Sequence, residues 1–175
     1  MPKIFIIIGK SASGKDTIYK KLLENKELNL KTVVMYTTRH IRVSETDGVE
    51  YHFVDEKKFE ELKNQNKIIE YRSYNTVHGI WRYFTVNDGQ IDLDKNDYLM
   101  MGTLESFGQI RDYFGHDKVI PIYIEVDDGT RLMRALLREQ QQENPKYAEM
   151  CRRFLADNED FSEENIAAYG IKKRY

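Results

Sequence analysis

Residues 9–15 of the chain read GKSASGK, and they directly follow an apolar run, IFIII, at positions 4–8. A short, continuous apolar run of this kind is typical of a strand that is buried on both faces in a parallel sheet. The segment after the loop, Asp16–Glu24, carries apolar residues at helical spacing and therefore predicts a helix. The sequence thus predicts a strand, a loop with two glycines and a helix in immediate succession.

The loop fits the pattern G-x-x-x-x-G-K, which binds phosphate groups when a strand precedes it and a helix follows it. Its glycines allow backbone conformations that bulkier residues resist, so that successive N–H groups face inward as an anion-binding nest. The helix start adds unpaired N–H groups and a positive dipole end. Lys15 supplies a mobile cation to the β- and γ-phosphates. The residues predicted to bind ATP are Gly9, Ser11, Ala12, Ser13, Gly14, Lys15, Asp16 and Thr17.

Asp16 stands where this pattern normally carries Ser or Thr, whose hydroxyl binds Mg²⁺. A carboxylate is also a hard oxygen ligand for Mg²⁺, and a negative charge is favourable at a helix N-terminus. It also brings negative charge close to the phosphates, which weakens triphosphate binding unless a metal is present. We therefore predict ATP and Mg²⁺ as ligands, with Asp16 as the metal ligand.

The composition is that of a globular protein large enough for one well-cored domain, with 175 residues, 41% hydrophobic and 32% charged. The net charge of −2 lacks the basic surplus that is usual in nucleic-acid binders. Cys151 is the single cysteine, which suits a reducing cytosol. We see no signal peptide and no apolar run of the length of a membrane span. We expect a cytoplasmic protein, a monomer or homodimer, without nucleic-acid or membrane partners.

Strand and helix patterns alternate towards the two ends of the chain, and an aromatic, β-branched segment lies between them at 68–86, where short strands and a hairpin are expected. This arrangement predicts a three-layer α/β domain with a parallel sheet. The polar stretch 138–144 is predicted to be a mobile lid. The further predicted strands are 31–36, 51–54, 98–102 and 119–126, and the further predicted helices are 56–64, 106–114, 127–142 and 146–160.

A second informative stretch begins with YTTRHIR at 36–42 and continues through Glu45, Gly48 and Tyr51. It resembles the guanylate kinase pattern T-T-R-x-x-R-x-x-E-x-x-G-x-x-Y-x-F-V. The resemblance covers roughly residues 3–160 and is strongest over 4–54. It implies that Arg39, Arg42 and Tyr51 hold the phosphate of an acceptor monophosphate, a role for which two guanidinium forks and a phenol are well suited.

The segment Ile68–Tyr71 resembles the family's F-[IL]-E segment, whose glutamate accepts hydrogen bonds from guanine N1–H and the amino group. The resemblance implies that Glu70 reads the base; the alternative is an edge-strand carboxylate that faces water. His78 stands where the family has a phosphate-binding tyrosine, and its alternative is a packed surface imidazole. Met35 and Ile80 stand where the family has hydroxyl groups near the base, so the resemblance carries less information on base specificity.

Arginines lie on both helices predicted after residue 126. In guanylate kinases such arginines neutralise charge on the transferring phosphoryl group. The resemblance gives this role to Arg138 and Arg153, with Arg134 and Arg152 as alternates, while the alternative is solvent-facing arginines paired with glutamates. Met101 and Thr103 stand where the family has acidic residues, and Glu105 just beyond them is a possible substitute. The predicted catalytic residues are Lys15, Arg39, Arg138 and Arg153.

The resemblance implies a three-layer P-loop NTPase fold with a parallel sheet, a small β-rich insert that binds a nucleoside monophosphate, and a helical lid. Residues 1–34 and 97–175 would form the core, with the lid at about 138–150, and residues 35–96 would form the insert. The implied activity is ATP-dependent phosphoryl transfer to a nucleoside monophosphate, first of all GMP. Two alternatives stay open: a kinase for another nucleotide or a small phosphorylated metabolite, and a guanylate-kinase-like binding module with little turnover.

Overall fold

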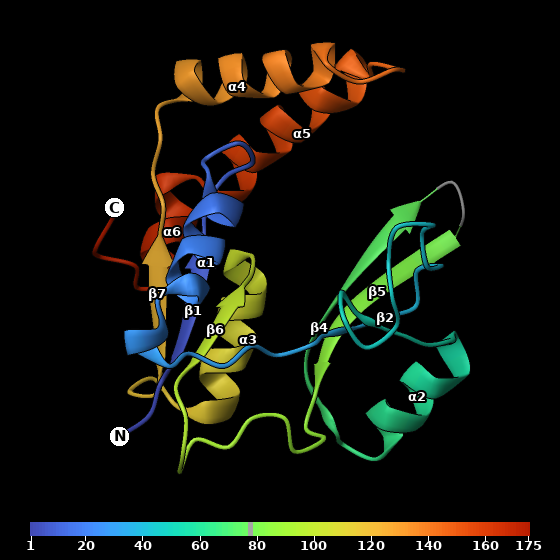
Figure 1. The fold of residues 1–175 in the computed structure, drawn as a ribbon, viewed down its shortest axis with the longest axis vertical. Coiled ribbons are helices and arrows are strands. Elements are labelled where there is room, and N and C mark those ends of the chain that lie inside the picture. Colours follow the sequence, from blue (N-terminus) through green and yellow to red (C-terminus); the bar gives the residue numbers. More distant parts are fainter. Residues whose placement is uncertain (77–78) are drawn as a thin grey trace.

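The computed structural model describes residues 1–76 and 79–175. It contains two separate sheets (Figure 1), one with the strand order β6-β1-β7 and one with the order β3-β2-β5-β4. The strands are β1 (Ile4–Ile8), β2 (Tyr36–Thr37), β3 (His52–Phe53), β4 (Ile68–Thr76), β5 (Gly79–Val86), β6 (Tyr98–Met101) and β7 (Val119–Tyr123). The helices are α1 (Lys15–Glu24), the short η1 (Lys26–Leu28), α2 (Glu56–Asn64), α3 (Leu104–Phe114), α4 (Asp128–Gln140), α5 (Tyr147–Asp160) and α6 (Glu163–Ala168).

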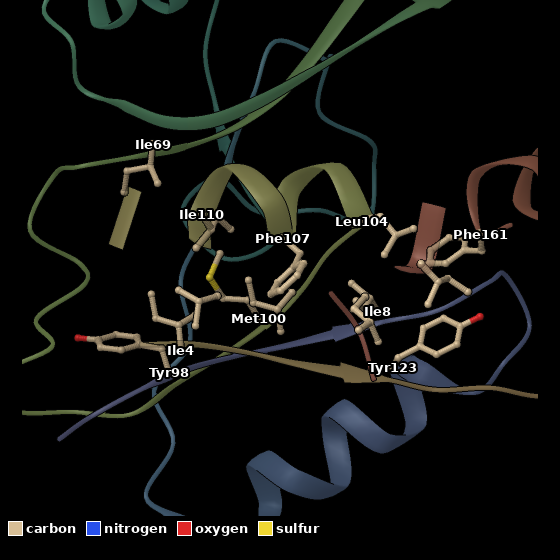
Figure 2. Packing of buried hydrophobic residues seen from close by; sticks show 14 residues of the cluster. Ile4, Ile8, Ile69, Tyr98, Met100, Leu104, Phe107, Ile110, Tyr123 and Phe161 are labelled. Atoms are coloured by element: carbon tan, nitrogen blue, oxygen red, sulfur yellow. The ribbon is translucent and has the colours of Figure 1, made fainter. Parts of the chain in front are cut away.

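The first sheet is parallel, with β1 at its centre. Side chains alternate between the two faces of a strand, and both faces of β1 are covered. Ile4, Ile6 and Ile8 pack with α3, as Figure 2 shows for two of them. Ile7 faces the other way, towards the apolar side of α1. Helices on both faces of a parallel sheet confirm the predicted three-layer α/β fold.

The second sheet is mixed and carries α2 on one face. Phe59 and Leu62 of α2 pack against Phe84 of β5 in a separate small core. Asp55 begins α2 as predicted, because its carboxylate accepts a hydrogen bond from the backbone N–H of Lys58 at 2.7 Å. Since α2 covers one face, the side chains that point to the other face remain available to line a site.

The two sheets are held together where β4 meets α3. Gln109 accepts a hydrogen bond from the backbone N–H of Tyr71 at 3.0 Å, and its amide donates to the carbonyl of Tyr71 at 3.1 Å. A register shift between Ile68 and Glu70 accompanies this contact, and Ile69 joins the core beneath α3. The second sheet is therefore attached to the first layer through a defined strand edge.

The last part of the chain forms α4, α5 and α6. Figure 1 shows α4 and α5 next to each other above the loop between β1 and α1. Glu139 of α4 accepts a hydrogen bond from the backbone N–H of Lys146 at 2.5 Å, which ties the connection to the start of α5. None of the helices in the described ranges combines the length and apolar character that crossing a bilayer requires.

The strands predicted at 31–36, 51–54, 98–102 and 119–126 are all shorter in the structure. Of the predicted strand 31–36, only Tyr36 belongs to a named strand, while Lys31 forms an isolated bridge with Tyr98. The reason is that residues 32–35 cross from one sheet to the other. The backbone N–H of Val34 donates its hydrogen bond to the side chain of Gln90 and not to the backbone of a neighbouring strand. The predicted strand 119–126 ends at Tyr123. There the C-terminal end of the chain forms backbone hydrogen bonds with the end of β7 and the residues that follow it.

Helix α6 was not among the sequence-based predictions. Ser162 caps it by accepting a hydrogen bond from the backbone N–H of Asn165, and Ile166 is buried in the main core. The helix has only six residues, so its apolar periodicity is too short to be recognised in the sequence. The predicted helices that overlap α3, α4 and α5 differ from the observed ones only at their ends, where assignments commonly vary.

Candidate active site

The loop between β1 and α1 is shaped by glycine at both ends. Gly9 has a φ of 151°, and a Cβ at this position would lie 2.5 Å from the carbonyl oxygen of Ile124. Gly14 has a φ of 91° and stands at the N-cap of α1. Both values lie in the region that side chains disfavour. The glycines of the predicted pattern therefore allow the chain to turn sharply from the end of β1 into α1.

Lys15 lies in the first turn of α1, and its ammonium group donates a hydrogen bond to the carbonyl oxygen of Lys10 at 2.9 Å. Burial lowers the pKa of the Lys15 ammonium group, against the opposing effect of the Asp16 and Asp157 carboxylates. Asp16 and Thr17, the next residues of α1, are exposed. The Lys15 ammonium group thus lies against its own loop, next to the exposed carboxylate of Asp16 and the exposed hydroxyl of Thr17.

Ser13 contributes a buried hydroxyl to the loop. Its Oγ has no hydrogen-bond partner among the described residues. Buried hydroxyl groups normally have a partner, and an exception calls for an explanation such as a missing ligand. The unpaired hydroxyl is consistent with a loop that binds an anion through polar groups.

Helix α5 reaches the loop through Asp157. The Asp157 carboxylate accepts a hydrogen bond from the backbone N–H of Ser11 at 2.7 Å. Arg131 of α4 donates to the carbonyl of Ser11 at 3.0 Å and lies 3.6 Å from Asp157. Its guanidinium also pairs with Asp128 at 2.7 Å, and its side chain is only 1% exposed. Arg131 therefore ties α4, α5 and the loop into one unit.

A cavity of about 660 Å³ opens between the loop and α5; we call it the loop cavity. Its walls are formed by the loop between β1 and α1, by the start of α3, by α5 and by one residue of the second sheet. Burial raises the pKa of the Asp160 carboxyl in its wall. The lining residues that matter here are Gly9, Ser11, Lys15, Tyr74, Glu105, Arg152, Arg153, Asp157 and Asp160.

A second cavity, of about 440 Å³, lies between α4 and α5; we call it the arginine cavity. Arg42, Arg138 and Arg153 line it, together with Ser11 of the loop. Arg153 lines both cavities. Arg134, the alternate to Arg138, donates to the carbonyl of Ala12 at 3.4 Å. The structure thus brings together three of the arginines that the sequence analysis selected, from three separate segments.

Arg39 is not placed with them. Its guanidinium makes two hydrogen bonds to Glu45, at 2.9 and 2.7 Å, and its side chain is only 3% exposed. The hydrogen bonds from Arg39 hold the pKa of the Glu45 carboxyl at about 2. Arg39 lines neither the loop cavity nor the arginine cavity. In this structure it folds the 39–45 loop, and its predicted role towards the acceptor phosphate remains a prediction.

The second sheet has a smaller cavity of about 340 Å³, the sheet cavity, on the face that α2 does not cover. Tyr51 lies in its wall, whereas Glu70 is not among its lining residues and has a side chain that is 0% exposed. Glu70 accepts hydrogen bonds from Thr85 and Arg72, so it is not a water-facing edge carboxylate. His78 lies outside the described residues. The sheet cavity is lined by Met35, Tyr51, Arg72, Tyr74, Trp81 and Tyr83.

The sequence analysis did not select Asp157 or Arg72, and it considered Arg131 only as one of several helix arginines. Asp157 and Ser11 are 146 residues apart, so no local pattern could join them. Arg72 could have been found, because it follows Glu70 by two residues in a predicted strand and must point to the same face. The alternation of side chains along that strand was therefore the signal that could have indicated Arg72.

A parallel sheet with helices on both faces, and a glycine loop that leads from its central strand into α1, define the P-loop NTPase fold. A family model described as guanylate kinase matches residues 1–87. The chain belongs to the guanylate kinase family.

Curated relatives agree with this assignment. The chain is 32% identical over 136 residues to a guanylate kinase of Mycoplasma genitalium, which covers 77% of this chain and 55% of that protein. It is 40% identical over 74 residues to a guanylate kinase of Brucella melitensis, which covers 42% of this chain and 32% of that protein. The chain therefore spans about half or less of the length of these relatives.

A solved structure supports the fold. The crystal structure of guanylate kinase from Anaplasma phagocytophilum matches with a TM-score of 0.59 at 23% identity, over 93% of this chain and 71% of that one. Since the identity is low, this likeness bears on the fold alone.

Proposed function

We propose that the protein transfers the γ-phosphoryl group of ATP to a nucleoside monophosphate, and that GMP is an acceptor. The observation that carries this proposal is the loop cavity, which is lined both by Lys15 and Arg153 and by Tyr74 of the second sheet. A phosphate donor on the loop and an acceptor on the sheet would therefore share one space. The names of the curated relatives support GMP as the acceptor.

The donor half rests on the loop. Its backbone N–H groups, the start of α1 and the Lys15 ammonium group are the parts that hold a triphosphate in loops of this pattern. The Ser13 hydroxyl, buried and unpaired among the described residues, is a further donor. Asp157 now accepts the hydrogen bond from the N–H of Ser11, so a phosphate oxygen would take the place of that carboxylate.

The residues present fit a Mg²⁺ ion that arrives with the nucleotide. In the described part of the chain, no three His, Cys, Asp or Glu side chains group to hold a metal ion. Magnesium in nucleotide sites is commonly bound by one or two carboxylates together with phosphates and water. Asp16, an exposed carboxylate next to Lys15, would be its protein ligand. The ion would neutralise charge on the β- and γ-phosphates.

The transfer step needs positive charge around the moving phosphoryl group more than it needs a base, because the acceptor phosphate is already an anion. Arg42, Arg138 and Arg153 line the arginine cavity and would provide that charge. Closure of α4 and α5 over the site would exclude water, so that transfer outcompetes hydrolysis. In this proposal, residues 1–34 and 97–175 form the core with a lid at about 138–150, and residues 35–96 form the acceptor insert.

A coupled assay with ATP, Mg²⁺ and a panel of nucleoside monophosphates tests the proposal. We expect GDP to form from GMP, and we expect Lys15→Ala to lower the rate about 100-fold or more. Lys20→Ala is the matched control, because Lys20 is an exposed lysine of the same helix. If the protein binds ATP and GMP but phosphorylates none of the monophosphates, the chain is a binding module and the proposal is wrong.

A further inference from the structure

One face of the second sheet lines the sheet cavity. In the β4–β5 hairpin, Glu70 pairs with Thr85, Arg72 with Tyr83, and Tyr74 with Trp81. Because side chains alternate along a strand and paired residues share a face, these side chains point to the same side of the sheet. The rung between them, Ser73 with Arg82, points to the other side, where Arg82 packs over Phe59 of α2 at 4.5 Å.

Glu70 is already engaged in this arrangement. Thr85 donates a hydrogen bond to one carboxylate oxygen at 2.8 Å, and Arg72 donates to the other at 3.3 Å. The Glu70 side chain is 0% exposed, and its burial raises the pKa of the carboxyl group. A base that presented N–H groups to Glu70 would first have to displace Arg72. Glu70 therefore serves to hold Arg72, and it does not itself face the sheet cavity.

Arg72 is the charged side chain in the wall of the sheet cavity. A guanidinium has five N–H donors, and in the described part of the chain its hydrogen bonds go only to Glu70 and to the sulfur of Met35, the latter at 3.7 Å. Donors remain to face the cavity. The other walls are Met35 and four aromatic rings, Tyr51, Tyr74, Trp81 and Tyr83, which suit a flat ring. The charge of Arg72 is balanced by Glu70, so the cavity suits a neutral ring with acceptor atoms.

We propose that Arg72 reads the base of the acceptor through the O6 and N7 atoms of a 6-oxopurine, and that the 2-amino group of guanine is not read. Arginine donates to O6 and N7 in its commonest specific contact with guanine. Hypoxanthine presents the same two acceptors, whereas adenine presents an amino donor in place of O6. The substrate class is then the 6-oxopurine monophosphates, IMP as well as GMP. This inference rests on the proposed function, because it concerns the acceptor of that reaction.

The single tryptophan of the chain, Trp81, lines the sheet cavity and reports its occupancy by fluorescence. Titrations with GMP, IMP and AMP, without ATP, need no turnover. We expect Kd values for GMP and IMP within about threefold of each other, and AMP at least about tenfold weaker, as the loss of one acceptor implies. Binding of GMP more than about tenfold tighter than IMP would show that the amino group is read, and it would overturn the inference.

Variants identify the residue. Arg72→Met is expected to weaken GMP and IMP equally, by about 10- to 100-fold. Arg82→Met is the matched control, because it removes a guanidinium from the opposite face of the same hairpin and should leave both Kd values unchanged. Arg72→Lys keeps the charge beside Glu70 but loses the planar fork, and it should weaken binding in a folded protein if Arg72→Met does not fold. Unchanged binding in a folded Arg72 variant overturns the inference.

The experiments distinguish a failure of the proposed kinase activity from a failure of the inference on base reading. If GMP and IMP bind alike but neither is phosphorylated, the proposed kinase activity fails and the inference on base reading holds. If only a pyrimidine monophosphate is phosphorylated and neither purine quenches Trp81, the inference fails and the kinase proposal survives with another acceptor.

Discussion

The Asp157 carboxylate of α5 accepts a hydrogen bond from the backbone N–H of Ser11, at 2.7 Å, within the loop that is proposed to bind phosphate. An acidic side chain thus holds a position at which a phosphate oxygen would be a natural acceptor. Both groups are anions, so they compete for the same donor, and binding of one requires the other to leave. The affinity of the loop for a phosphate group should therefore depend on the charge of the Asp157 side chain of α5.

Asp157→Asn should therefore tighten ATP binding. The amide carries no charge and is a weaker acceptor, and we expect an increase in affinity of about tenfold, measured by calorimetry at low salt. Asp160→Asn is the control, because Asp160 lines the same loop cavity and has no hydrogen bond to Ser11 among the described residues. Equal gains in both variants would point to a general effect of charge and would contradict the specific competition.

Arg131→Met should destabilise the fold. The guanidinium is 1% exposed and contacts Asp128, Asp157 and the carbonyl of Ser11. Loss of one partner leaves the others without compensation, and we expect the free energy of unfolding in urea to fall by about 2–3 kcal/mol, less than for a fully buried pair because Asp128 is half-exposed. Arg134→Met, on the exposed side of the same helix, should change it by less than about 0.5 kcal/mol. Similar losses of unfolding free energy in both variants would contradict the stabilising role of the Arg131 contacts.

The Arg39–Glu45 pair predicts a pH dependence of stability. The pKa of Glu45 is about 2 in the folded protein, below its usual value, so the folded state binds its proton less readily than the unfolded state. The stabilisation is then complete above the unfolded pKa of about 4.3 and is lost as the pH falls towards the folded pKa.

Thermal melts between pH 5 and pH 2 test this prediction. Glu45→Gln should flatten the decline of Tm in this range relative to the wild type, since the glutamine does not titrate. Glu60→Gln, at an exposed position of α2, is the control. A Glu45→Gln profile that runs parallel to the wild type would show that this pair contributes nothing to the acid limb.

Gly9→Ala should cost more stability than an alanine at another glycine with positive φ. Its Cβ would lie 2.5 Å from the carbonyl oxygen of Ile124, whereas a Cβ at Gly89, with a φ of 92°, meets nothing within 4 Å. We expect about 1 kcal/mol of destabilisation for Gly89→Ala from backbone strain alone, and about 2–4 kcal/mol for Gly9→Ala. Chemical denaturation measures both. Equal losses of stability would mean that the backbone at Ile124, the residue after β7, moves without cost.

The sequence predicts those parts of the molecule that depend on near neighbours. The run at 4–8, the loop and α1 form one local unit, and the Asp55 cap of α2 lies within three residues of its partner. The strand predicted at 31–36 was wrong over most of its length, because strand formation depends on a distant partner and residues 32–35 cross between sheets. Local preference cannot reveal which sheet, if any, a segment joins.

The candidate site follows the same division. The loop residues and the arginines can be selected from their motifs, but their grouping depends on how α4 and α5 pack. For Arg39 the motif predicts a ligand contact, which remains a prediction, and it does not reveal the contact with Glu45 that the structure shows. The contact of Asp157 with Ser11 could not be predicted, since the two residues are brought together only by the complete fold.

The attachment of Gln109 to Tyr71 has a consequence for self-association. Strand β4 stands at the edge of the second sheet, and an edge strand offers unpaired N–H and C=O groups to any other chain. Gln109 occupies both backbone groups of Tyr71, and α3 contacts β4 there, where a foreign strand would have to dock. The Gln109 side chain thus blocks the pairing of another strand at Tyr71, and it does so with the same two hydrogen bonds that join the sheets.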